Sequence, residues 1–353
     1  MNKDSIIGCV LGTAVGDALG LPYEGLPRKR QFRLYKDING YRFFLGRGMV
    51  SDDTEHTCMV AEALIEAGGD SSLFARSLAR RMRYWLLTLP AGAGLGTLRA
   101  VIKLWLGFSP EKSGVFTAGN GPAMRSAIIG VACGDDYGKL KEFVRASTVI
   151  THSDPKAYYG ALAVALAAHM SSKGQDVYSL DYLEALTELL AGVGAEEFLA
   201  LMNTMTASVR MGEKSCDYAA TTLDQAEGVS GYIYHTVPVA IHAWLSCQDN
   251  FKTSLRWVIR LGGDTDTTAA ILGGIIGARI GKEGLPPALL EGLMEWPRSV
   301  RWMEKLGETL ADALPTGKPA KPPTLPFPAV ICRNLFFLLM VLLHGFKRFL
   351  PPY

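Results

Sequence analysis

The chain has 353 residues, of which 48% are apolar and 20% charged, a composition that indicates a globular protein with a large core and excludes a disordered one. A formal net charge of +2 provides no basic field for nucleic acid, so we expect no DNA duplex as a partner. Six cysteines are scattered without a CxxC pair, and no signal-peptide pattern opens the chain, so we expect a cytoplasmic protein with reduced thiols.

Helical periodicity dominates the chain. Apolar residues recur at i, i+3, i+4 and i+7 and predict helices at 6–14, 54–69, 72–89, 157–172, 180–194, 196–212 and 236–247. Runs of alternating β-branched residues are nearly absent, and the helical segments are separated by Gly, Pro and Asp clusters. Many segments are rich in Ala and Gly, which allows helices to approach closely. The pattern predicts a single all-α domain.

The glycine-rich N-terminal stretch GCVLGTAVGDALGLPYEG carries two carboxylates. Asp17 falls within the predicted helix, and we interpret it as a buried carboxylate that is satisfied by the N-terminus of a neighbouring helix. Glu24 follows the helix in a Pro-containing turn, from which it could swing toward a metal ion. From the pattern alone, a solvated loop carboxylate is the simpler interpretation of Glu24.

Two short motifs place two carboxylates and a hydroxyl at the start of an apolar helix. They consist of Ser51, Asp52 and Asp53 in one case and of Asp264, Asp266 and Thr267 in the other. Helix capping accounts for one such side chain per helix, whereas paired carboxylates in an apolar setting repel each other unless a cation neutralises them. All-oxygen ligands suit Mg²⁺ or Mn²⁺, and six of them suit a bridged pair of ions about 3.5–4 Å apart. We predict a binuclear metal centre, with capping as the alternative.

The end of the chain divides into a linker and an apolar segment. We expect a main domain at 1–312, a Pro-rich linker at 313–328 and an apolar helix at 329–353. The uninterrupted apolar run 335–343 is too short to span a bilayer, which needs about 20 residues. Docking of this helix on the domain is the favoured interpretation, and an interfacial membrane helix anchored by Lys347 and Arg348 is the alternative.

Six motifs in order resemble the ADP-ribosylglycohydrolase family. They are GxxLGxAxGDALGxPxE, SDDT, GNGPAMR, THSDP, GVSGY and GGDTDTTAA, and they extend from about Ile6 to Ile280. The family includes the dinitrogenase reductase-activating glycohydrolases and the hydrolases of ADP-ribosyl-arginine and ADP-ribosyl-serine. The resemblance implies an all-α, orthogonally packed domain with two Mg²⁺ or Mn²⁺ ions.

The resemblance also implies roles for single residues. The metal ligands would be Ser51, Asp52, Asp53, Asp264, Asp266 and Thr267, and Glu24 would be the catalytic glutamate. The ADP-ribose cleft would contain Thr117, Gly119, Asn120 and Gly121 around the diphosphate, His152 near the ribose and Tyr232 at the adenine. A structural histidine and a core tyrosine are the alternatives for the last two.

The implied activity is Mg-dependent removal of ADP-ribose from protein by cleavage at the anomeric carbon of the distal ribose. We favour an arginine linkage and leave a serine linkage open, because some arginine-directed members carry an aspartate in a loop that here has no carboxylate between residues 89 and 105. The alternatives are an ADP-ribose-binding or crystallin-like structural protein on the same fold, or a hydrolase of O-acetyl-ADP-ribose or ADP-ribosylated nucleic acid.

Overall fold

The computed structural model describes residues 2–347. Within them the chain forms helices joined by turns and isolated β-bridges, without a sheet, so the predicted all-α fold is confirmed. The first part contains α1 (Lys3–Gly20), η1 (Leu21–Tyr23), α2 (Arg28–Leu34), α3 (Asp52–Ala67), α4 (Ser71–Leu87), α5 (Leu95–Trp105) and α6 (Pro110–Ser113).

The middle of the chain contains η2 (Ala123–Arg125), α7 (Ala127–Cys133), α8 (Tyr137–Val149), α9 (Pro155–Ser171), α10 (Ser179–Leu189), α11 (Glu196–Arg210) and α12 (Ser215–Thr221). The last part contains α13 (Ile233–Ser246), α14 (Phe251–Ile259), α15 (Thr265–Gly284), α16 (Pro287–Gly292), α17 (Val300–Ala313), η3 (Leu314–Thr316) and α18 (Phe327–Lys347).

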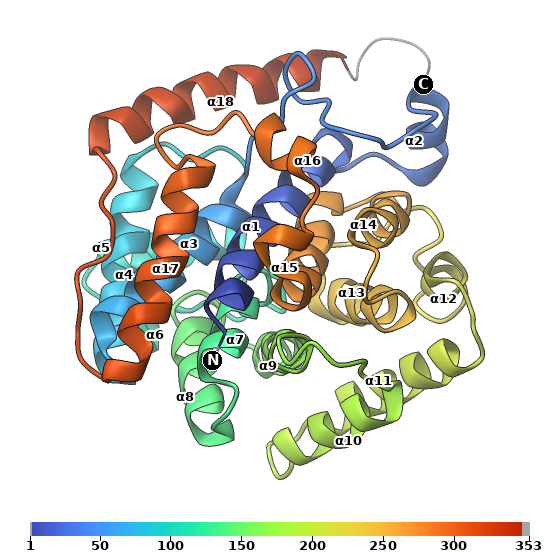
Figure 1. Ribbon diagram of the computed structural model, residues 1–353, viewed down its shortest axis with the longest axis horizontal. Helices are drawn as coiled ribbons and strands as arrows, with labels where there is room; N and C mark the ends of the chain where they lie inside the picture. Colours follow the sequence, from blue (N-terminus) through green and yellow to red (C-terminus); the bar gives the residue numbers. More distant parts are fainter. Residues whose placement is uncertain (1, 348–353) are drawn as a thin grey trace.

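Helices α1 and α15 form the central pair of the fold (Figure 1). Their backbones touch, because a Cβ added to Gly12 would lie 2.2 Å from the Gly273 carbonyl oxygen, and one added to Gly16 would lie 2.1 Å from that of Ala269. Glycine at four-residue spacing on α1 therefore permits the contact. This close contact brings the end of α1 beside the start of α15.

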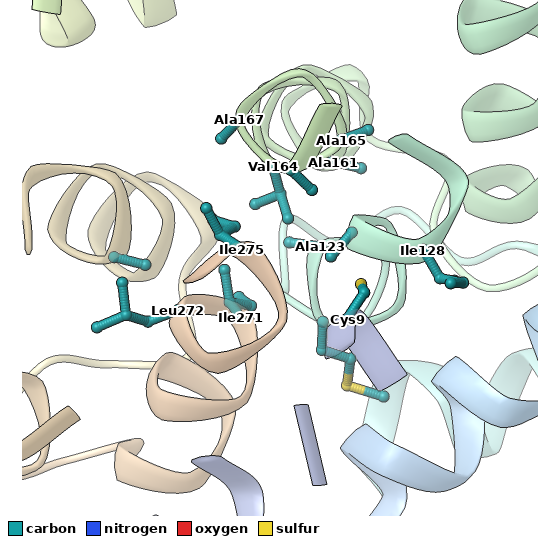
Figure 2. Close-up of a cluster of buried hydrophobic side chains, with 14 of the residues drawn as sticks. Cys9, Ala123, Ile128, Ala161, Val164, Ala165, Ala167, Ile271, Leu272 and Ile275 are labelled. Carbon is teal, nitrogen blue, oxygen red and sulfur yellow. The ribbon is translucent and has the colours of Figure 1, made fainter. Parts of the chain in front are cut away.

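The apolar core surrounds this pair. Figure 2 shows Cys9 of α1 and Ile271 and Ile275 of α15 near the alanine-rich helix α9 and the η2–α7 segment. The small side chains of α9, such as Ala161 and Ala165, are fully buried. They let α9 lie close to its neighbours, which is the packing role that the Ala- and Gly-rich composition predicts.

The C-terminal segment wraps back over the domain. After η3 the chain runs without helix as far as Phe327, and the amide of Ala320 donates to the Ile65 carbonyl at the end of α3 at 3.0 Å. Helix α18 begins two residues before the expected start at 329, and residues 348–353 of the predicted helix lie outside the described residues. Phe337 and Met340 of α18 pack in a small apolar cluster of their own with Leu21, Phe43 and Met49.

Candidate active site

The turn before α15 depends on its two glycines. Gly262 and Gly263 have φ angles of +77° and +78°, which is the left-handed region that glycine adopts without strain. A Cβ at Gly263 would also lie 2.1 Å from the Val229 carbonyl oxygen, and the same oxygen accepts from the Asp264 amide at 2.7 Å. The Gly-Gly pair thus fixes Asp264 at the N-terminus of α15.

The two acidic motifs meet in space although 214 positions separate their contact residues. Ser51 Oγ donates to Asp53 Oδ2 at 3.0 Å, and Thr267 Oγ1 from the other motif donates to the same oxygen at 3.3 Å. Ser51 is the N-cap of α3 and Asp264 the N-cap of α15. Two helix N-termini therefore direct their positive dipole ends at one cluster of carboxylates.

Asp17 supports this cluster from α1. Its carboxylate accepts from the Ser51 amide at 2.9 and 3.0 Å and from the Thr54 amide and hydroxyl at 3.2 and 2.6 Å. The interpretation of Asp17 as a buried carboxylate satisfied by a neighbouring helix N-terminus is confirmed. Burial raises the pKa of Asp17 to about 7, and the hydrogen bonds from Thr54 and Ser51 oppose that shift.

The remaining carboxylates carry strong electrostatic strain. Burial raises the pKa values of Asp52, Asp53 and Asp266 well above the usual range, and repulsion from neighbouring carboxylates raises them further. Asp53 Oδ1 and Asp266 Oδ1 are buried without a hydrogen-bond partner. Buried charged carboxylates without partners are costly, so the cluster must be neutralised by protons or by a cation, and its own side chains supply no positive charge.

Glu24 lies on a turn whose backbone is hydrogen-bonded to the Gly-Gly turn before α15. It is exposed, it follows η1, and the next amide, that of Gly25, donates to the Gly263 carbonyl at 2.8 Å. An antiparallel bridge between Leu26 and Gly263 adds a second tie. The turn thus places Glu24 beside Asp264, while the carboxylate itself remains accessible from solvent.

These side chains line a cleft of about 280 Å³. Its lining includes Glu24, Asp52, Asp264, Asp266, Thr267, Thr117, Gly119, Asn120, Gly121 and His152. Ser51 and Asp53 lie behind them, buried. A more open hollow of about 710 Å³ adjoins the cleft and shares Glu24 and Asp264 with it.

The glycine-rich loop packs closely on His152. A Cβ at Gly119 or at Gly121 would lie 3.0 or 3.1 Å from the imidazole ring. Burial lowers the pKa of His152 to about 3, so the imidazole is neutral, and its Nδ1 contacts Thr151 Oγ1 at 2.8 Å. Asn120 Nδ2 donates to Asp264 Oδ2 at 2.7 Å and so joins the loop to the carboxylate cluster.

Tyr232 is placed at the edge of this region. Its backbone forms a bridge with Gly119, but its side chain is not among the residues that line the cleft. Its ring lies 5.0 Å from that of His235 and its hydroxyl accepts from Lys156 Nζ at 3.3 Å. The structure therefore brings all the expected site residues into one region, with Tyr232 beside the cleft and not in its wall.

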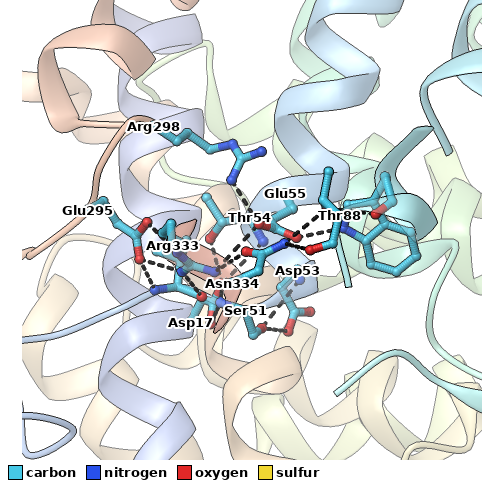
Figure 3. A network of polar contacts seen from close by, with 12 residues as sticks. Asp17, Ser51, Asp53, Thr54, Glu55, Thr88, Glu295, Arg298, Arg333 and Asn334 are labelled. Atoms are coloured by element: carbon cyan, nitrogen blue, oxygen red, sulfur yellow. Dashed lines mark hydrogen bonds and ion pairs between the residues drawn. The ribbon is translucent and has the colours of Figure 1, made fainter. Parts of the chain in front are cut away.

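Two parts of the site are not predicted by the sequence: the opposite wall of the cleft and a network of charged side chains beneath the cleft. The wall is formed by Gly92, Gly94, Leu95, Gly96 and Thr97, in the loop whose lack of carboxylates the sequence shows. Beneath the site, Arg333 of α18 donates to Glu295 at 2.6 and 3.1 Å and to the Val50 carbonyl at 2.5 Å, next to Ser51 (Figure 3). The only sequence signal was a polar pair, Arg333 and Asn334, inside an apolar run.

Comparison with known proteins decides the family. The sequence profile of the ADP-ribosylglycohydrolase family matches residues 2–320. The chain belongs to the ADP-ribosylglycohydrolase family. It is therefore an enzyme, an ADP-ribosylhydrolase, as the six motifs predict, and helix α18 lies beyond the part that the family profile covers.

Relatives of this ADP-ribosylhydrolase match along most of its length. The ADP-ribosyl-(dinitrogen reductase) glycohydrolase of Rhodospirillum rubrum is 26% identical over 306 residues, which cover 84% of this chain and 93% of that protein. The ADP-ribosylarginine hydrolase Tri1 of Pseudomonas putida is 28% identical over 324 residues, covering 88% and 79%. A solved ADP-ribosylglycohydrolase-related protein complex aligns with a TM-score of 0.65 at 26% identity, covering 88% of this chain and 98% of that one.

Proposed function

We propose that this chain removes ADP-ribose from modified proteins by metal-dependent hydrolysis at the anomeric carbon of the distal ribose. One observation carries the proposal: two carboxylate-bearing helix N-termini and the accessible Glu24 face the same cleft. A cleft that combines buried carboxylates, an exposed carboxylate able to carry a proton and glycine-lined walls suits a ribosyl diphosphate ligand.

The side chains of the cluster fit a pair of hard divalent cations. The six side chains Ser51, Asp52, Asp53, Asp264, Asp266 and Thr267 would hold Mg²⁺ or Mn²⁺, because they offer oxygen atoms alone. Among residues 2–347, no three acidic, His or Cys side chains lie close enough together to hold an ion as they stand, so the fit rests on the oxygen chemistry of these six residues and on the burial of most of them. The unpartnered Oδ1 atoms of Asp53 and Asp266 support the fit most directly.

Each residue then has a separate task. Bound ions would orient ribose hydroxyls and lower the pKa of a coordinated water. Glu24, at the boundary of the cleft and the open hollow, moves the proton: it protonates the leaving group or accepts a proton from the attacking water. Gly119 and Gly121 leave room for the diphosphate, and Asn120 holds Asp264 in orientation.

The linkage in the substrate is inferred from one relative and from the loop that faces the carboxylates. The name of the Pseudomonas putida relative favours arginine-linked ADP-ribose. The loop from Leu89 to Trp105 contributes glycines, Leu95 and Thr97 to the cleft and no carboxylate, so it offers no anionic partner for a guanidinium. We infer that arginine is accepted mainly through the ADP-ribose half and that serine-linked substrates compete.

Release of free ADP-ribose from matched peptides tests the proposal. Purified protein with Mg²⁺ is presented with the same peptide ADP-ribosylated on arginine, serine or glutamate, and the ADP-ribose released is quantified by chromatography. Hydrolysis of the arginine-linked peptide, with weaker hydrolysis of the serine-linked one, is the expected result. Binding of ADP-ribose without release from any peptide would instead favour a non-catalytic binding protein.

A further inference from the structure

Helix α18 buries a polar pair among apolar side chains and leaves a second apolar face exposed. Arg333 and Asn334 point into the protein, where Asn334 Nδ2 donates to the carbonyl and the hydroxyl of Thr88 at 2.9 Å. Leu335, Leu339 and Leu342, in contrast, are about half exposed. A helix of a soluble domain normally buries its apolar stripe and exposes its polar one.

The exposed apolar side chains form one continuous stripe. Leu335, Leu339, Leu342 and Phe346 follow one another at i, i+4, i+7 and i+11, so they lie on one face, and Phe346 is 68% exposed. The turn containing Phe44 extends this face, because its ring packs against that of Phe336 at 5.4 Å. Figure 1 places α18 along one edge of the molecule. We call the four side chains Leu335, Leu339, Leu342 and Phe346 the α18 stripe.

The helix is apolar enough to cross a membrane, but its contacts hold it along the domain. By length and hydropathy both α1 and α18 could cross a membrane. The apolar stretch of α1 is 100% buried inside the protein, whereas that of α18 is only 28% buried. Arg333 and Asn334 are bonded to Glu295 and Thr88 of the domain, so α18 lies on the surface and does not leave it. Such a helix suits the interface of a bilayer and not its interior.

The charge of the C-terminal segment indicates which kind of surface covers the α18 stripe. The segment 313–353 contains five Lys or Arg residues and no Asp or Glu, and Lys347 is the last described residue of α18. One of the five, Arg333, is buried and paired with Glu295, and the segment remains basic without it. Exposed Arg47 lies in the turn that follows Phe44. A second copy of the chain would bring two such basic segments together, which is repulsive, whereas an anionic lipid surface complements them.

We propose that the α18 stripe docks this ADP-ribosylhydrolase on the surface of an anionic lipid bilayer, with the stripe in the acyl boundary and the basic residues at the headgroups. The stripe belongs to a helix beyond the residues that the family profile matches, so docking is a property of this chain added to the family's catalytic domain. The catalytic cleft is bordered by other segments and does not require the lipid.

Vesicle co-sedimentation of the full chain tests this inference. We expect binding to vesicles of phosphatidylcholine mixed with phosphatidylglycerol, and weaker binding to phosphatidylcholine alone or at high salt. The double variant Leu342→Glu/Phe346→Glu should bind on the order of a hundredfold more weakly, because two apolar anchors become charges. The control Leu106→Glu/Met211→Glu adds the same charges at side chains that are 73% and 76% exposed elsewhere, and it should bind as wild type.

Two further measurements keep the outcome decisive. The melting temperature should be unchanged in both double variants, because the four substituted side chains are exposed. The hydrolysis of a soluble ADP-ribosylated peptide should also be unchanged, because none of the four lines the cleft. Failure of the wild-type chain to bind anionic vesicles would overturn the proposal. A wild-type dimer in light scattering that Leu342→Glu/Phe346→Glu dissociates, without vesicle binding, would assign the stripe to a second copy instead.

Discussion

Replacing Arg333 by methionine should destabilise the protein strongly, because this side chain neutralises a buried carboxylate. Arg333 is 6% exposed, and its guanidinium lies 2.6 Å from Glu295 Oε1 and 3.6 Å from Glu55 Oε1. Methionine keeps the apolar stem but leaves Glu295 with one buried negative charge and a single remaining hydrogen bond, from the Val50 amide at 2.7 Å. Breaking a buried ion pair on one side costs about 3–5 kcal/mol.

This cost converts into a measurable shift in melting temperature. With an unfolding entropy of about 2.1 cal/mol/K per residue over 353 residues, Tm should fall by about 4–7 °C in differential scanning calorimetry. The control Arg301→Met, at an exposed arginine on α17, should shift Tm by less than about 1 °C. The double variant Arg333→Met/Glu295→Gln should recover most of the loss, because glutamine removes the buried charge and still accepts from Val50.

A Tm for Arg333→Met equal to that of wild type would refute this reasoning, and so would a double variant less stable than the single one. The network also lies directly behind Ser51, since Arg333 donates to the Val50 carbonyl. The affinity of the protein for Mn²⁺ should therefore weaken in Arg333→Met and recover in Arg333→Lys, which retains a donor and a charge.

Three further predictions concern the helix pair, a buried histidine and the proton carrier. Gly12→Ala should lower stability by about 1–3 kcal/mol in urea unfolding, because the methyl group would lie 2.2 Å from the Gly273 carbonyl oxygen, whereas Gly40→Ala, with open space around it, should be neutral. Burial lowers the pKa of His242 from 6.5 to about 4, so the folded protein holds this imidazole neutral. The free energy of unfolding should therefore be unaffected by His242 above pH 6.5 and fall by about 3 kcal/mol as the pH drops toward 4. His242→Gln should flatten that decline, and an unchanged slope would contradict the prediction. Glu24→Gln should reduce kcat and kcat/KM together by about 10²–10⁴-fold with Mn²⁺ affinity intact, and a loss of metal would make Glu24 a ligand instead.

The sequence predicts the elements that local chemistry determines. The helix expected at 54–69 is α3 at Asp52–Ala67, and that at 196–212 is α11 at Glu196–Arg210, because a buried apolar face leaves a clear 3.6-residue period. Both acidic motifs could be assigned to helix N-termini for the same reason. The burial of Asp17 was predictable from its position among glycines in a helix.

Contacts between distant segments could not be predicted in this way. The glycine loop around Gly94 shows no periodicity and no titratable group, so nothing in its residues indicates that it faces the carboxylates across a cleft. Arg333 and Glu295 are 38 residues apart and belong to no shared motif, and the docking of α18 brings them together. The ring of Tyr232, which the resemblance to the family expects at the adenine, lies beside the cleft next to its backbone bridge with Gly119, and its contact with adenine stays a prediction.

Calorimetric titration of Mn²⁺ into protein that has been dialysed against chelator and then against buffer tests the proposed binuclear metal centre most directly. We predict two ions per chain for the wild type and the loss of at least one in Asp53→Asn and in Asp266→Asn, because the unpartnered oxygens of these side chains are available to a cation. The control Asp312→Asn changes an exposed carboxylate that does not line the cleft, and it should take up two ions. Wild-type protein that binds no Mn²⁺, or Asp53→Asn and Asp266→Asn variants that both bind two ions, would contradict the binuclear centre and return both acidic motifs to simple helix caps.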